Sequence, residues 1–251
     1  MDIPITDLLI LLGVGFTAGF INVIAGGGSL LTLPVLMFLG LPAPVANASN
    51  RISIIAQNVF AVAGFQSKGV HAFPYSIYIS LSAVIGALIG AKISVELDEE
   101  LFQRVIAIVM VLVVFMIIFK PLKPNLTGEE KLDLKSIIIG CIVFFFIGIY
   151  GGFIQAGVGF FIIAALTNIN GFSLVKTNSA KVFVALIYSL SAVGVFIYED
   201  VINWEYGIAL AVGTSLGGWV SSRWSVKKGD KWIKRILVVV VNILAIKLWL
   251  F

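Results

Sequence analysis

Residues 19–34, with the sequence GFINVIAGGGSLLTLP, decide how this chain folds. Three consecutive glycines, Gly26, Gly27 and Gly28, separate an apolar run at 6–25 from a short one at 29–40. Glycine interrupts helices, and a break at membrane depth persists only where protein or a cavity covers it. The stretch therefore predicts a broken membrane helix in the first part of the chain.

The composition around this stretch is that of an integral membrane protein. Of the 251 residues, 60% are hydrophobic and only 12% are charged, against roughly 25% charged residues in soluble domains. This balance excludes a soluble enzyme, a nucleic-acid binder and a disordered chain. The net charge of +4 is explained by basic cytoplasmic loops.

Apolar segments continue through the whole chain. A membrane helix needs about 20 apolar residues, and two of the ten predicted segments, 29–40 and 159–169, are much shorter. The second short segment also follows glycines, in the sequence GGFIQAGVGFF at residues 151–161. The full set of predicted segments is 6–25, 29–40, 46–66, 73–92, 101–119, 136–156, 159–169, 177–198, 204–224 and 232–250.

The two halves of the chain resemble each other. A shift of about 131 residues puts Gly28 on Gly159 and Gly40 on Gly171, and Ser49-Asn50-Arg51 falls on Ser179-Ala180-Lys181 at a shift of 130. Such internal repeats are typical of secondary transporters. We therefore expect an all-α polytopic membrane protein with a first repeat at 1–119, a cytoplasmic linker at 120–135 and a second repeat at 136–251.

Loop charges indicate that the repeats are inverted. Lys68 and His71 follow the third segment, whereas the matching loop carries Glu199, Asp200 and Glu205. The acidic loop at 96–100 likewise matches a basic one at 223–235. Because basic loops stay in the cytoplasm, equivalent loops are predicted on opposite sides, with the N-terminus outside.

Inverted repeats with a broken helix in each half place a substrate near the midplane, where the breaks meet. Backbone N–H groups at the start of a half-helix favour an anion, here near Ser29 and Phe160. The predicted site therefore contains glycines that expose the backbone and amides that orient a ligand: Gly26, Gly27, Gly28, Gly157, Gly159, Asn22 and Gln155. Close helix packing is the alternative explanation for the glycines.

Two cations, Arg51 and Lys181, stand at equivalent positions near the start of long apolar segments. Intramembrane cations normally face the interior of a helix bundle, and these two are predicted to neutralise an anion from both sides. Snorkelling to the headgroups is the alternative. Their polar neighbours either cap the helices or bind the ligand, and these are Ser49, Asn50, Asn178 and Ser179.

No carboxylate lies centrally in an apolar segment, and the only histidine, His71, lies in a predicted loop. An interior with cations and no acids suits an anion and disfavours a cation pump. We find no catalytic constellation, no metal cluster and no cofactor motif. The sequence therefore predicts a transporter of small anions in the lipid bilayer rather than an enzyme, with no nucleic-acid partner and an undetermined oligomeric state.

The chain resembles the TauE/SafE sulfite-exporter family, also called the TSUP permeases. The resemblance rests on Gly19-Phe20-Ile21-x-x-x-Ala25-Gly26-Gly27-Gly28, Pro34, Gly40-Leu41-Pro42 and Ala48-Ser49-Asn50-Arg51, and in the second half on Gly151-Gly152-Phe153 and Ala156-Gly157-x-Gly159. It implies transport of sulfite, organosulfonates or similar sulfur-containing anions across a prokaryotic plasma membrane. An anion channel and a permease for another small organic anion stay open as alternatives.

Overall fold

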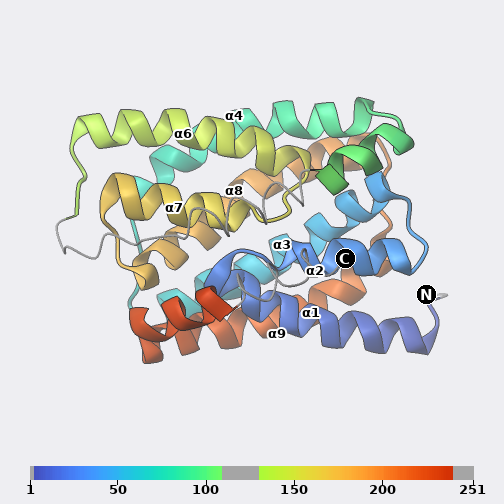
Figure 1. Cartoon of the computed structure of the whole chain (residues 1–251), viewed down its shortest axis with the longest axis horizontal. Helices are drawn as coiled ribbons and strands as arrows, with labels where there is room; N and C mark the ends of the chain where they lie inside the picture. Colours follow the sequence, from blue (N-terminus) through green and yellow to red (C-terminus); the bar gives the residue numbers. More distant parts are fainter. Residues whose placement is uncertain (1–2, 109–129, 240–251) are drawn as a thin grey trace.

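The computed structural model describes residues 3–108 and 130–239, and this part of the chain is all-α and contains no strand. The expected fold class is confirmed. The predicted segments 101–119 and 232–250, helical over 99–108 and 230–239, extend beyond the described residues, as does most of the predicted linker. The helices are α1 (Ile5–Ala25), α2 (Ser29–Phe38), α3 (Ala43–Gln66), α4 (Tyr75–Glu96), α6 (Leu134–Phe153), α7 (Val158–Asn170), α8 (Leu174–Tyr198) and α9 (Trp204–Lys228) (Figure 1).

Both predicted helix breaks are present. α1 ends at Ala25 because Gly26 adopts the left-handed conformation, with φ of 85°. α6 ends at Phe153, and Gln155 and Gly157, with φ of 67° and 72°, turn the chain into α7. α7 begins at Val158 rather than near Phe160, because Gly157 ends the turn directly before it.

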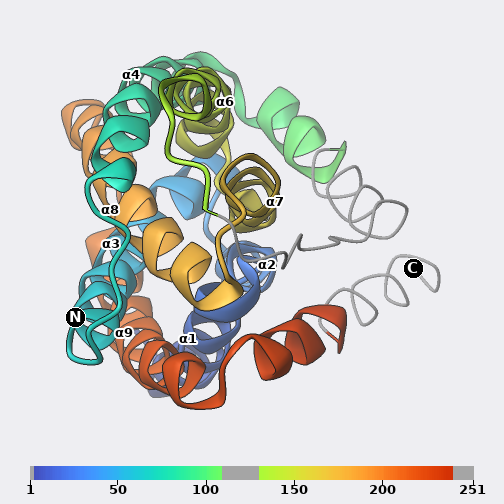
Figure 2. The same ribbon diagram turned by 90° about the vertical axis from the view of Figure 1, so that its left-hand side faces the viewer.

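The helices form three layers. Figure 2 shows α4 and α6 on one side of the bundle and α1 and α9 on the other, with α2, α3, α7 and α8 between them. α2 runs back toward the end of the bundle at which α1 begins, and α7 does the same relative to α6 (Figure 1). The two breaks therefore lie inside the bundle, where other helices cover them.

Small residues bring the outer helix pairs into close contact. A Cβ atom at Gly90 in α4 would lie 2.8 Å from the backbone nitrogen of Phe153 in α6, and one at Gly217 in α9 would lie 2.8 Å from that of Phe20 in α1. Only glycine allows backbones to approach this closely. Gly90 and Gly217 are therefore the points at which α4 packs on α6 and α9 packs on α1.

Equivalent connections lie at opposite ends of the bundle. In Figure 1 the α3–α4 connection lies at the left end and the α8–α9 connection at the right end. The α4 C-terminus lies at the right, whereas the α9 C-terminus lies at the left. This arrangement is the one that inverted halves require, and the inverted repeat with its boundaries stays a prediction.

Several helices are long and apolar enough to cross a bilayer. Among the described residues, α1, α4, α6 and α8 are long and apolar enough to cross a membrane. The outer face of α4 exposes Leu81, Ile85 and Leu88 by 61%, 58% and 44%, and such a surface fits hydrocarbon. α3 combines its length with many buried polar residues, so it lies at the polar centre of the bundle.

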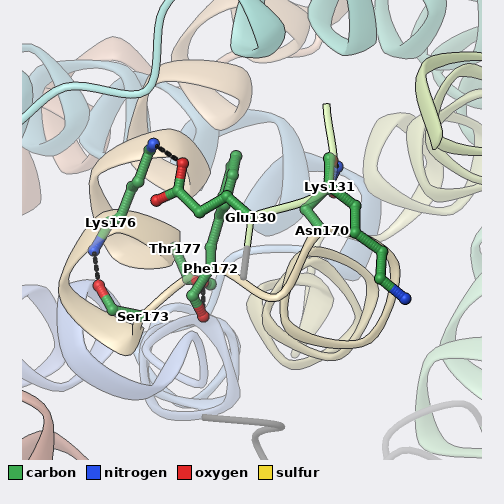
Figure 3. A network of polar contacts seen from close by, with 7 residues as sticks. All are labelled: Glu130, Lys131, Asn170, Phe172, Ser173, Lys176 and Thr177. Carbon is green, nitrogen blue, oxygen red and sulfur yellow. Dashed lines mark hydrogen bonds and ion pairs between the residues drawn. The ribbon is translucent and has the colours of Figure 1, made fainter. Parts of the chain in front are cut away.

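The residues before α6 form an ion pair and hydrogen bonds with the ends of two inner helices. Figure 3 shows Glu130 paired with Lys176 at the start of α8. The backbone of Lys131 exchanges hydrogen bonds with Asn170 at the end of α7, each of 2.9 Å. These contacts hold the described end of the predicted linker against the bundle.

Candidate functional site

The two helix breaks meet in the centre of the bundle. A Cβ atom on Gly159 would lie 2.8 Å from the carbonyl oxygen of Gly26 and would overlap its Cα atom. A Cβ atom on Gly26 would in turn lie 2.9 Å from the backbone nitrogen of Phe160. The structure therefore brings the glycines of the two predicted half-sites into backbone contact.

The end of α1 is capped by side chains from α8. Lys181 Nζ donates to the carbonyl oxygens of Asn22 and Val23 at 3.0 and 2.8 Å, and to Asn178 Oδ1 at 2.8 Å. Asn178 Nδ2 donates to the next carbonyl, that of Ile24, at 3.1 Å. The last carbonyls of a helix lack intrahelical partners and carry partial negative charge, so these buried donors satisfy them.

The end of α6 is capped in the same way by α3. The guanidinium of Arg51 donates to the carbonyl oxygens of Gly151 and Gly152, the latter at 2.8 Å, and to Gln155 Oε1 at 2.5 Å. Asn47 Nδ2 donates to the next carbonyl, that of Phe153, at 2.9 Å. In each case a cation and an asparagine cover three successive carbonyls.

Arg51 and Lys181 are completely inside the protein, with exposed fractions of 0% and 3%. Neither reaches the lipid headgroups, so the snorkelling alternative is wrong for both. Their positive charges face backbone carbonyls, and Arg51 also lies 5.5 Å from the ring centroid of Phe196. The two predicted cations therefore lie at the polar centre, where each holds one break.

A small cavity of about 10 Å³ lies beside the meeting point of the breaks, room for about one water molecule. Four of the predicted site residues line it, and its walls combine amide, cationic and aliphatic groups. Its lining is Asn22, Ser29, Asn58, Gln155, Val158, Gly159, Ile162, Lys181, Val182 and Ala185.

Three residues that line this cavity have hydrogen-bond donors without partners. Asn58, which is 1% exposed, has an Nδ2 atom with no partner among the described residues. The backbone N–H groups of Ser29 and Gly159, at the starts of α2 and α7, also have no acceptor in the described part of the chain. Such donors suit the oxygen atoms of an anion.

Several predicted site residues lie away from this cavity. Ser49 Oγ accepts from the backbone N–H of Asn203 at 2.8 Å, and Ser179 Oγ donates to the carbonyl of Val70 at 3.1 Å. Asn50 accepts from Ser53. None of the three, nor Asn178, caps its own helix, because α3 and α8 begin earlier than predicted, after Pro42 and Ser173.

Gly27 and Gly28, the remaining glycines of the first break, pack against neighbouring protein atoms. A Cβ atom at Gly27 would lie 2.9 Å from the ring of Phe160, and one at Gly28 would lie 2.5 Å from the carbonyl oxygen of Ala18. The backbone N–H of Gly28 donates to Asn22 Oδ1 at 3.3 Å. These glycines therefore shape the turn, and they do not line the cavity.

Two important residues, Asn47 and Asn58, are absent from the sequence prediction. They lie on the same face of α3 as Arg51, at spacings of 4 and 7 residues, which a helix brings to one side. That spacing of polar residues in an apolar segment is the signal that would have found them.

A multi-pass helical bundle with broken helices and a buried polar centre defines the class of membrane transporters. The Sulfite exporter TauE/SafE family matches residues 11–248. The chain belongs to this family, whose members are transporters and not enzymes.

Curated relatives agree with this class. A "Probable membrane transporter protein ORF9" from Sinorhizobium sp is 27% identical over 98% of this chain and 94% of its own length. A "Probable membrane transporter protein" from Haemophilus influenzae is 27% identical over 99% and 96%. "Probable membrane transporter protein YfcA" from Escherichia coli is 28% identical over 95% and 88%. No solved structure matches the chain.

Proposed function

We propose that this membrane transporter is a secondary transporter that carries a small sulfur-containing anion, such as sulfite or an organosulfonate, by alternating access. The observation that carries this proposal is the central cavity, where Lys181 and the unpartnered donor of Asn58 lie beside the start of α7. No carboxylate of the described residues lines it. The name of the matched family supports sulfur as the element.

The donor groups fit an oxyanion. Asn58 Nδ2 and the N–H groups of Ser29 and Gly159 have no protein acceptor in the described part of the chain. Lys181 contributes a positive charge that no carboxylate neutralises, because its three partners are neutral oxygens. A bound anion thus gains several donors and a favourable potential in a buried place with low effective dielectric constant.

The size of the cavity favours alternating access over an open channel. Space of about 10 Å³ holds about one water molecule, so a sulfonate enters only when the surrounding helices move. The two break-bearing hairpins, α1–α2 and α6–α7, touch at Gly26 and Gly159. Movement of one hairpin against the other would open the site to one side at a time.

Several finer expectations belong to the same proposal. The site consists of the predicted residues around the breaks, with Arg51 and Lys181 supplying charge and Asn22 and Gln155 orienting the ligand. The protein lies in a prokaryotic plasma membrane with its N-terminus outside. The positive-inside distribution of the loops supports this orientation.

The deciding experiment is anion flux into proteoliposomes that contain the purified protein, with sulfite, methanesulfonate, sulfate, acetate and phosphate compared side by side. We expect saturable uptake of a sulfur oxyanion that is accelerated by the same anion on the opposite side. Much faster flux without this acceleration would indicate a channel. Selective uptake of acetate would keep the site and replace the substrate class, and uptake of none would contradict the proposal.

A further inference from the structure

The carbonyl groups at the two helix breaks resemble the groups that bind a coupling cation in other secondary transporters. Unwound backbone and the C-terminal ends of half-helices coordinate Na⁺ in many secondary transporters, because their carbonyl oxygens carry partial negative charge. Neither α1 nor α6 has a basic residue in its own last turn. Any positive charge at these ends therefore comes from elsewhere.

At the first break that charge is the ammonium group of Lys181. Its Nζ atom has three oxygen neighbours at 2.8–3.0 Å, two backbone carbonyls and the amide oxygen of Asn178. An ammonium group has three donors, so all of them are used. This is an oxygen cage around a cation that the chain itself supplies.

The second break repeats the arrangement with a different cation. The Arg51 guanidinium contacts the carbonyl oxygens of Gly151 and Gly152 and the amide oxygen of Gln155. Both cations come from the opposite half of the chain: α3 supplies the one at α6, and α8 supplies the one at α1. Each therefore connects two elements that must move apart or together in any opening of the site.

We propose that Lys181 and Arg51 are resident counter-cations that fill the coupling-ion positions at the two breaks, so that transport requires neither Na⁺ nor K⁺. This inference rests on the proposed function, because ion coupling has meaning only in a transporter. In such a cycle Lys181 and Arg51 take the place of Na⁺ or K⁺ at the helix ends. The positive charge stays with the protein throughout the cycle and holds the broken ends of the helices.

The first test measures substrate uptake into proteoliposomes while Na⁺ and K⁺ are replaced by N-methyl-D-glucamine. We expect uptake to change by less than about twofold, since twofold corresponds to about 0.4 kcal/mol. A fall of about tenfold or more, restored by Na⁺ or K⁺, would overturn the inference and leave the transporter proposal intact. Absence of uptake in every buffer would instead contradict the proposed function.

The second test uses the variant Lys181→Ala, which empties the cage and leaves its three oxygens in place. We expect a lower midpoint of thermal unfolding, and a recovery with Na⁺, K⁺ or methylammonium but not with N-methyl-D-glucamine, because a cation that binds only the folded state stabilises it. A purely structural lysine would not give recovery that depends on cation size. Equal stability in all four salts would contradict the cage.

Lys176→Ala is the matched control, because Lys176 lies on the same helix and pairs with Glu130 at the surface (Figure 3). Its side chain is 26% exposed, and surface pairs contribute little to stability. We expect no cation-specific recovery in this variant. Arg51→Ala, tested with guanidinium in place of methylammonium, provides the same experiment at the second break. If Lys181→Ala does not fold, the ion replacement in the wild-type protein still decides the matter.

Discussion

Gly26 and Gly159 touch through their backbones, and this contact joins the two helix breaks of the chain. A Cβ atom on Gly159 would lie 2.8 Å from the Gly26 carbonyl oxygen. Gly26 also has a φ of 85°, which other residues rarely adopt. Helices that come from opposite halves of the sequence thus meet at a point where neither has a side chain.

The substitution Gly159→Ala tests the need for this contact. The added methyl group pushes the breaks apart, and overpacking of this kind costs about 1–3 kcal/mol. We expect a lower thermal midpoint and a loss of anion uptake in proteoliposomes. Gly194→Ala is the control, because Gly194 lies in α8 with nothing within 4 Å of its Cβ position. Equal behaviour of the two variants would contradict a tight central contact.

The substitutions Arg51→Ala and Arg51→Lys test the cap on α6. Arg51→Ala leaves three buried oxygens without a donor, and each unsatisfied group costs about 1–3 kcal/mol. We expect lower stability to chemical denaturation together with loss of uptake. Arg51→Lys retains the charge but not the planar fork, so it is expected to lie between Arg51→Ala and the wild type. Unchanged uptake in the double variant Arg51→Ala, Lys181→Ala would contradict a role for both cations in the site.

The glycine clusters have a local sequence signal, whereas the partners of Arg51 have none. The breaks were predictable because consecutive glycines act locally on the backbone. The partners of Arg51 and Lys181 were not, since their contacts span 104 and 158 positions in the sequence. The sequence therefore indicated that two cations lie inside the bundle, and only the fold shows that they cap opposite helix ends.

The candidate site was predictable only in part, for the same physical reason. Asn22 and Gln155 were found because they flank the glycines, and both line the cavity. Asn58 was missed because it lies in the middle of α3, far along the chain from either break. Ser49 and Ser179 instead bind the loops before α9 and after α3, a tertiary contact that has no local sequence signal.

The substitution Asn58→Asp tests whether the cavity binds an anion. It preserves the size of the side chain but replaces the free Nδ2 donor with a carboxylate oxygen that repels a negative charge. We expect the apparent affinity for the transported anion to fall by about tenfold or more, which corresponds to about 1.4 kcal/mol. Concentration-dependent uptake or thermal stabilisation by the anion measures this change.

Asn168→Asp is the control for this variant, because Asn168 lies on α7 at an exposed position. The same change in charge there lies outside the cavity lining and is expected to leave the affinity within about twofold of the wild type. Equal loss in both variants would indicate a long-range effect of net charge rather than a site at Asn58.

The inverted arrangement of the two halves is tested by labelling the ends of α3 and α8. Lys68 and Glu199 follow these helices at equivalent places, both are exposed, and their connections lie at opposite ends of the bundle (Figure 1). Single-cysteine variants Lys68→Cys and Glu199→Cys are made after Cys141→Ser has removed the only native thiol. Because basic loops stay in the cytoplasm, a membrane-impermeant thiol reagent applied to intact cells should label Cys at 199 and not at 68, and inside-out vesicles should give the reverse. Labelling of both positions from the same side would contradict inversion, since a parallel repeat places equivalent loops together. The Gly26–Gly159 contact and the caps that Lys181 and Arg51 form would then join halves of the same orientation, and inversion would not explain them.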